Sequence, residues 1–216
     1  MSILTYPLGF IGGGKVFYNG VMENSCLFSK GAQTELRSYS VGQASTTTAT
    51  CSLWLKRAAR IGEVASGIIG AGISTTPRNA VLDFNAADEI FAEGKPGGGA
   101  GAAWGAATSA VYRDPSAWYH ICAVFDSNNG VEADRYRLYV NGERQVMGDA
   151  VALDQGENIN WIGADAASIA LVGGYGGSDD TDGSDSIDGL MTDIYNIDGY
   201  ALGPENFGEY KNGVWI

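Results

Sequence analysis

The sequence predicts an all-β protein folded as a two-sheet antiparallel β-sandwich. Short runs rich in β-branched and aromatic residues recur along its 216 residues, and turn residues separate them. No segment keeps the helical period of about 3.6 residues. Many short strands divided by turns are the pattern of a sandwich, and one domain of this class commonly reaches this length.

The most informative passage is Ser116–Arg144, which has the pattern of two strands joined by an acidic connector. Near its end stands Asn141-Gly142, the commonest dipeptide of tight β-hairpin turns. In the second strand, Tyr136, Leu138 and Val140 fall on one face, and the residues between them fall on the other. This alternation predicts a half-buried strand in an antiparallel sheet.

Residues 1–20 are glycine-rich and irregular, and we expect them to form an arm that docks on a neighbouring subunit. A single sandwich domain is expected to follow at 21–216. Its other strands are expected at 25–29, 35–39, 45–57, 66–73, 80–84, 159–163, 169–172 and 190–197. Residues 94–107 are expected to form a mobile loop or a close-packed crossing rather than a regular element. Residues 173–189 are an expected loop by composition, and a short helical turn is expected at 202–207.

The charge balance argues against two kinds of partner. Thirteen basic and 25 acidic residues give a formal net charge of −12 at pH 7. Nucleic acids and anionic lipids both attract basic surfaces, so we expect no nucleic-acid partner and no membrane partner. No window reaches the roughly 18 apolar residues of a membrane helix. The N-terminus lacks the features of a secretory signal, so synthesis in the cytoplasm is expected.

The three cysteines are Cys26, Cys51 and Cys122, an odd number that does not form a disulfide framework. Cys51 and Cys122 lie in apolar strand-like runs, where a free thiol packs as a small hydrophobic group. A bridge between these two stays open, because it depends on whether their strands are neighbours with suitable geometry.

Several segments follow one order along the chain: TATCSLWLKR, SAVYRDPSAWYHICAVFD, RYRLYVNGER, WIGAD and IDGLMTDIYNIDGYALGPENFGEYKNGVWI. In this order they resemble the laminin-G-like, concanavalin-A-like jelly rolls of tailed-bacteriophage structural proteins. The most specific pieces are VYRDPSAWYH (111–120) and IDGYALGPENFGE (197–209), and the resemblance covers 45–216. It implies a jelly-roll fold and a virion location in a phage-infected host, and it implies no reaction.

We therefore expect a non-enzymatic virion protein, either a capsid decoration or part of a fibre or tail-associated assembly. Its expected partners are other virion proteins and further copies of itself in a homo-oligomer. The alternative is a carbohydrate-binding module that adsorbs to a host surface glycan. For contact with a ligand or partner, Trp104 in the glycine-rich stretch is the aromatic residue expected to be most exposed, with Tyr112 and Tyr175 behind it.

No catalytic residue and no required cofactor are expected. His120 is the sole histidine, and no G-x-S-x-G motif supplies a serine nucleophile. We expect His120 to lie in the core, bonded to the backbone or to a neighbouring hydroxyl. Glu132 and Asp134 are the nearest match to the paired acids of a glycosidase, but the last Glu of that motif is missing.

The acidic run at 179–185 suggests a calcium site. Calcium takes about six to eight oxygen ligands, and Asp179, Asp180, Asp182 and Asp185 can supply carboxylates from one tight loop. Some laminin-G domains bind calcium at the sandwich rim, so the resemblance is compatible with such a site. The alternative is a solvated, mobile acidic loop, since glycine-rich charge runs usually have that character.

Overall fold

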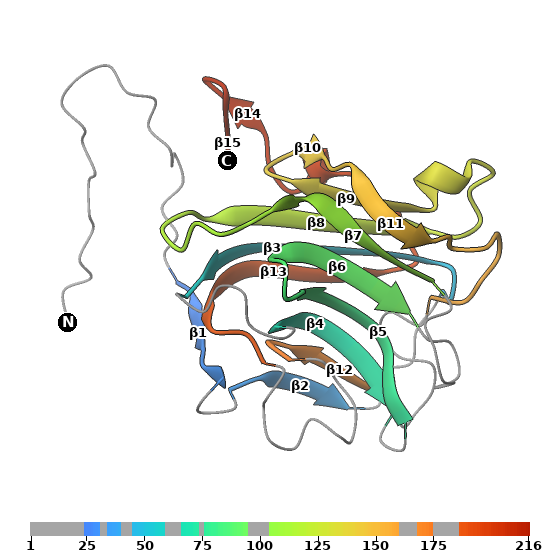
Figure 1. The fold of residues 1–216 in the computed structure, drawn as a ribbon, viewed down its shortest axis with the longest axis horizontal. Coiled ribbons are helices and arrows are strands. Elements are labelled where there is room, and N and C mark those ends of the chain that lie inside the picture. The colour runs from blue at the N-terminus through green and yellow to red at the C-terminus, as the bar shows by residue number, and fades with distance from the viewer. Residues whose placement is uncertain are drawn as a thin grey trace.

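Two antiparallel sheets packed face to face form the molecule (Figure 1). This computed structural model describes residues 24–30, 34–39, 45–58, 66–73, 76–94, 104–159, 168–174 and 186–216. Within these ranges no α-helix occurs, and one-turn 3₁₀ helices lie at Glu132–Asp134 (η3) and Pro204–Asn206 (η4). The predicted all-β antiparallel sandwich is confirmed. The expected arm at 1–20 lies outside the described residues.

Sheet A contains, within the described residues, six strands in the order β1-β13-β3-β8-β9-β10. Their bounds are Cys26–Phe28 (β1), Gly189–Asp198 (β13), Thr48–Arg57 (β3), Tyr119–Asp126 (β8), Tyr136–Val140 (β9) and Glu143–Arg144 (β10). The late strand β13 therefore lies between β1 and β3, which come from the N-terminal part of the chain.

Sheet B contains, in the same described ranges, seven strands in the order β11-β7-β6-β5-β4-β12-β2. Their bounds are Met147–Val151 (β11), Trp104–Val111 (β7), Glu89–Gly94 (β6), Thr76–Phe84 (β5), Ser66–Ile73 (β4), Ser168–Val172 (β12) and Leu36–Tyr39 (β2). Near the C-terminus, Tyr210–Lys211 (β14) and Val214–Trp215 (β15) form a separate hairpin, at the top of Figure 1.

The prediction that 94–107 holds no regular element is wrong at both ends, and residues 95–103 lie outside the described residues. Residues 89–94 form β6, and β7 begins at Trp104. The two strands are paired, with Gly94 opposite Trp104. A Cβ at Gly94 would come within 2.2 Å of the Trp104 Nε1 atom, so this glycine makes room for an indole ring. Glycine here reflects close packing within a sheet, a role that composition does not distinguish from a loop.

Strand β3 is buried on both of its faces. Its inward residues Cys51, Leu53 and Leu55 belong to the core between the sheets. Its outward residues Thr50 and Ser52 are also 0% and 1% exposed. Because a buried hydroxyl is costly without a hydrogen bond, the outer face of β3 needs a polar cover.

The C-terminal segment 199–216, called here the C-terminal cover, lies on that outer face. Thr50 Oγ1 donates to the carbonyl oxygen of Tyr200 at 2.7 Å and accepts from the backbone nitrogen of Leu202 at 2.9 Å. Cys122 Sγ on the neighbouring strand β8 lies 3.9 Å from the Leu202 carbonyl oxygen. The backbone of the C-terminal cover thus shields these side chains from water and supplies their hydrogen-bond partners.

The two cysteines of β3 and β8 do not form a bridge. In the β3–β8 pairing, Cys51 is opposite Ala123, and Cys122 is opposite Ser52. Because neighbouring positions along a strand point to opposite faces, Cys51 points into the core and Cys122 points to the C-terminal cover. Both thiols are free.

His120 lies beneath the C-terminal cover and is 1% exposed. Its Nε2 lies 2.9 Å from Ser52 Oγ, and its ring centroid lies 5.1 Å from that of Trp54 and 5.5 Å from that of Trp215. The expected buried histidine, bonded to a neighbouring hydroxyl, is confirmed. Burial lowers the pKa of His120 to about 4.

A buried ion pair fastens the end of β3 to sheet B. Arg57 is 5% exposed, and its Nη1 donates to Asp88 Oδ1 at 3.0 Å and to the Tyr112 carbonyl oxygen at 2.6 Å. The Tyr112 nitrogen in turn donates to the Asp88 carbonyl oxygen at 2.9 Å. Breaking such a pair leaves an uncompensated buried charge, so these contacts hold the backbone of Tyr112 in place.

No helix within the described ranges has the length and apolar character that crossing a bilayer requires.

The buried His120 predicts a loss of stability in acid. Its pKa falls from the ordinary 6.5 to about 4, so between these values the unfolded chain binds a proton that the folded chain does not. We expect the free energy of unfolding to decrease by up to about 3 kcal/mol as the pH falls through this range. Urea denaturation at each pH measures it. His120→Gln removes this titration, and equal pH slopes in both proteins would contradict the prediction.

Gly142 and Gly156 form a matched pair for testing the packing of Trp215. Both have a φ of +78°, but a Cβ at Gly142 would lie 2.3 Å from Trp215 Cε3, whereas at Gly156 it meets nothing within 4 Å. We expect Gly142→Ala to lower the free energy of unfolding by about 2 kcal/mol more than Gly156→Ala, because overpacking adds to the backbone strain. Chemical denaturation measures both. Equal losses would mean that Trp215 moves aside without cost.

Candidate functional site

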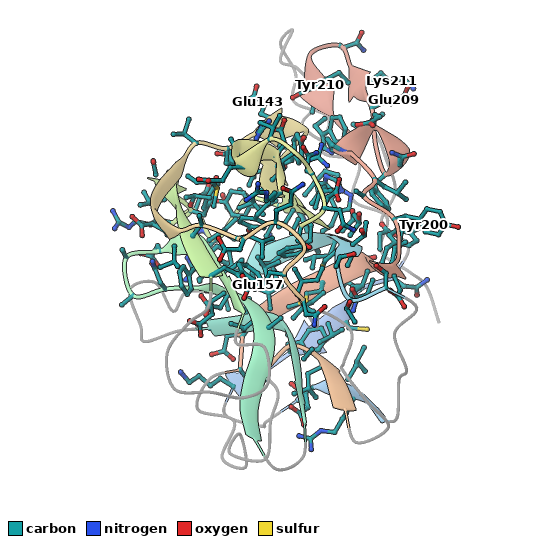
Figure 2. All side chains as sticks on the ribbon, turned by 90° about the vertical axis from the view of Figure 1, so that its right-hand side faces the viewer. Glu143, Glu157, Tyr200, Glu209, Tyr210 and Lys211 are labelled. Carbon is teal, nitrogen blue, oxygen red and sulfur yellow. The ribbon has the colours of Figure 1, made fainter. Side chains whose placement is uncertain are left out.

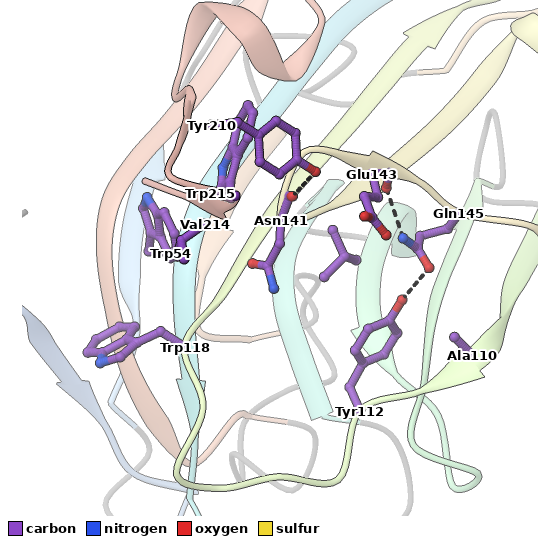
Figure 3. A pocket seen from close by; sticks show the side chains of 12 residues that line it. Trp54, Ala110, Tyr112, Trp118, Asn141, Glu143, Gln145, Tyr210, Val214 and Trp215 are labelled. Atoms are coloured by element: carbon purple, nitrogen blue, oxygen red, sulfur yellow. Dashed lines mark hydrogen bonds between the residues drawn. The ribbon is translucent and has the colours of Figure 1, made fainter. Parts of the chain in front are cut away.

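An aromatic groove opens between the β14–β15 hairpin and the turn that joins β9 to β10 (Figure 3). Its volume is about 490 Å³, within the range of small-molecule sites. The aromatic side chains that line it are Trp54, Tyr112, Trp118, Tyr210 and Trp215. The polar side chains that line it are Asn141, Glu143 and Gln145.

Trp215 lines the groove on the side of the β14–β15 hairpin. Added Cβ atoms at Gly142 and Gly208 would lie 2.3 Å and 2.8 Å from its ring, so both glycines are in close contact with the indole. The Tyr210 ring packs edge-on against Trp215 at a centroid distance of 5.0 Å. Tyr210 is 52% exposed, and its hydroxyl donates to the Asn141 carbonyl oxygen at 2.9 Å. The hairpin is thereby tied to the sheet.

Asn141 is held in one orientation by the sheet. It has a φ of 51° and precedes Gly142, as the mirror-image hairpin turns require. Its Oδ1 accepts from the backbone nitrogen of His120 at 2.8 Å, and its own nitrogen donates to the His120 carbonyl oxygen at 2.8 Å. Because Oδ1 is engaged, Nδ2 is the free end of the amide, and no described residue accepts from it.

On the opposite wall of the groove, consecutive hydrogen bonds join three residues. Tyr112 donates its hydroxyl to Gln145 Oε1 at 2.8 Å, and Gln145 Nε2 donates to the Glu143 carbonyl oxygen at 2.8 Å. Burial raises the pKa of Tyr112 to about 12, so this hydroxyl stays protonated. The Glu143 side chain is exposed, and no described residue pairs with its carboxylate. Burial and the charge of Glu143 both raise the pKa of Tyr210.

This arrangement is suited to binding. Aromatic faces can pack on the apolar faces of a ligand, while the neighbouring amide and carboxylate can form hydrogen bonds with its polar groups. Glu143 is the single carboxylate among the described lining residues, and acid-base hydrolysis of glycosides uses two. No cluster of three or more potential metal-ligating side chains occurs in the described part of the chain.

The two acids singled out in the sequence lie elsewhere. Glu132 and Asp134 are in η3, in a polar connector as expected, and Asp134 Oδ1 accepts from Arg144 Nη1 at 2.7 Å. Glu132 and Arg144 line a second cavity of about 370 Å³ beside β9 and β11. Since Asp134 is held by Arg144, this pair does not present two free carboxylates.

The predicted contact residues lie in different parts of the structure. Tyr112 lines the groove. Trp104 is 1% exposed, and its ring centroid lies 5.4 Å from that of Phe125 and 5.9 Å from that of Tyr136. The expectation that it is exposed is therefore wrong, because β7 pairs with β6 and turns this side chain into the core. Tyr175 and the predicted calcium ligands Asp179, Asp180, Asp182 and Asp185 lie outside the described residues.

The sequence pattern does not reveal most of the groove. It does not distinguish Trp118 and Tyr210 from the other aromatic residues, and it marks Asn141 as a turn residue alone. One available signal is that Asn212-Gly213, another of the Asn-Gly dipeptides of the chain, stands next to Tyr210 and Trp215. Two such hairpin turns, each beside aromatic residues, mark the two sides of the groove.

The comparisons agree with this fold. The family model described as concanavalin A-like lectin/glucanases superfamily matches residues 29–196. No curated protein has a sequence that matches this chain.

Among solved structures, the carbohydrate-binding module CBM40 of Ruminococcus gnavus IT-sialidase, bound to α2,6 sialyllactose, has a TM-score of 0.51 and 13% identity over 81% of this chain and 96% of that chain. A heptameric SAP-like pentraxin from Limulus polyphemus has a TM-score of 0.50 and 15% identity over 75% of this chain and 68% of that one. The likeness to these structures is one of fold. With its matched region and its two antiparallel sheets, the chain belongs to the concanavalin A-like lectin/glucanase superfamily.

Proposed function

We propose that this chain is a non-enzymatic carbohydrate-binding domain and that the aromatic groove is its binding site. The observation that carries the proposal is that Trp118 and Tyr210 line the same groove as polar groups with unused hydrogen-bonding capacity, Asn141 Nδ2 and the Glu143 carboxylate. A sugar ring has apolar faces and a hydroxyl rim, and these side chains match both.

The groove is also organised before a ligand arrives. Tyr112, Gln145 and Tyr210 are each fixed by a hydrogen bond of 2.8–2.9 Å. Rigid side chains lose little freedom on binding, which favours affinity in a shallow site. The sialyllactose bound to the module of similar fold supports a lectin role for this class of sandwich and does not identify the sugar for this chain.

The chain also has features that favour a second role on a virus particle. The segments 111–120 and 197–209, which resemble phage structural proteins, lie at the groove and in the C-terminal cover. We propose an accessory virion protein on the capsid or tail, assembled as a homo-oligomer, with the arm 1–20 contacting a neighbouring subunit. In this setting the groove faces a host glycan. Calcium at Asp179, Asp180, Asp182 and Asp185 remains a prediction.

Removal of the Trp118 indole ring tests whether the groove is the binding site. We expect Trp118→Ala to weaken binding to a glycan-array hit by at least about tenfold, or about 1.4 kcal/mol, because stacking area is lost. Tyr200→Ala is the control, since Tyr200 is 66% exposed and lies away from Tyr210 and Glu143 in Figure 2. Isothermal titration calorimetry measures both. Equal affinities for both variants would exclude the groove as the site.

Deletion of residues 2–14 tests the virion role. We expect the full chain to co-purify with phage particles in a fixed ratio, and the truncated chain to stay folded but not attach. Particle loading is measured by gel densitometry, and folding by circular dichroism. Full loading of the truncated chain would contradict the docking arm, and absence of the full chain from particles would contradict the virion role.

A further inference from the structure

We infer that the groove selects uncharged sugars and rejects acidic ones, and that Glu143 is the residue that sets this selectivity. The inference rests on the proposed carbohydrate-binding function. It names the chemical class of the ligand, which neither the fold nor its relatives specify.

The groove carries a negative formal charge. Among the described residues that line the groove, Glu143 carries a charge and none is lysine or arginine. Lys211 follows Tyr210 in β14, so its side chain projects from the other face of the hairpin. An acidic sugar needs a cation or several convergent donors for its carboxylate, and these lining residues supply no cation.

The polar groups of the groove include several acceptors for sugar hydroxyls. The hydroxyls of Tyr112 and Tyr210 already donate to Gln145 Oε1 and to the Asn141 carbonyl oxygen, so they offer a ligand their lone pairs. Gln145 Nε2 uses one of its two N–H groups on the Glu143 carbonyl oxygen, and Asn141 Nδ2 is a further amide donor among the lining residues. The groove therefore offers both donors and acceptors. The Glu143 carboxylate and the two tyrosine oxygens can accept from sugar hydroxyls.

Glu143 and Asn141 lie two positions apart in the same turn. The two residues flank Gly142 across the tight turn, and both line the groove in Figure 3. A carboxylate accepts a hydrogen bond and an amide Nδ2 donates one. The pair is suited to neighbouring hydroxyls on one sugar ring, one acting as donor and the other as acceptor. A carboxylate group in place of either hydroxyl would meet the charge of Glu143.

The whole chain strengthens this repulsion. Its net charge is −12, and at low salt, where the screening length reaches about 30 Å at 0.01 M, distant charges of the chain also act on an approaching ligand. An acidic glycan is thus disfavoured both during approach and in contact with Glu143. The sialyllactose bound to the module of similar fold does not carry over, because at 13% identity the likeness is one of fold alone.

The experiment uses the full chain and a glycan array that contains neutral glycans together with their sialylated or uronic-acid counterparts. The strongest neutral glycan and its acidic counterpart are then titrated by calorimetry at low and high salt. We expect the acidic form to bind at least about tenfold more weakly at low salt, with the difference shrinking as salt rises. Glu143→Gln should reduce the ratio at least about fivefold by strengthening binding of the acidic form. Glu157→Gln, which removes a carboxylate away from the groove in Figure 2, should leave the ratio unchanged.

The outcomes separate the inference from the proposed function. Preferential binding of acidic glycans overturns the selectivity and leaves carbohydrate binding in place. An unchanged ratio in a folded Glu143→Gln protein overturns the role of this carboxylate. Absence of binding to every glycan overturns the proposed function and this inference with it.

Discussion

Burial of strand β3 on both faces is the constraint on which the rest of the structure depends. The inner face packs apolar side chains into the core, but the outer face buries Thr50 and Ser52 as well. A buried hydroxyl without a partner costs about 1–3 kcal/mol. His120 satisfies Ser52, and the backbone of the C-terminal cover satisfies Thr50. The last part of the chain must therefore lie across sheet A, where it leaves a groove along its edge.

The groove is a consequence of how that cover ends. The β14–β15 hairpin places Trp215 against Gly142 and Gly208, and Tyr210 is anchored to the turn between β9 and β10. Positive φ angles at Asn141 and Gly142 make this turn tight enough to approach the indole ring. The same contacts that stabilise the cover thus position aromatic faces beside the amide of Asn141. Stability and a binding surface come from one set of interactions.

The region shared with the family does not include the whole groove. The family match spans 29–196, while Tyr210 and Trp215 lie beyond it. The sandwich is therefore shared with a broad superfamily, whereas one side of the groove is built from a segment outside the matched region. Fold alone does not specify what such a domain binds, because function resides in sites added to a common scaffold. The specificity of this chain must be sought in its own C-terminal hairpin and turn.

The sequence by itself determined the all-β class, the main strands such as 66–73, the short turn at Pro204 and the buried place of His120, because alternation and turn chemistry are local properties. The tertiary structure decided that Trp104 is core, that Cys51 and Cys122 point to opposite faces, and that a groove exists. Those outcomes depend on partners such as Ser52 with His120 and Tyr210 with Asn141, which lie 68 and 69 positions apart. A local pattern shows which side chains share a face, and only strand pairing over such distances shows what covers that face.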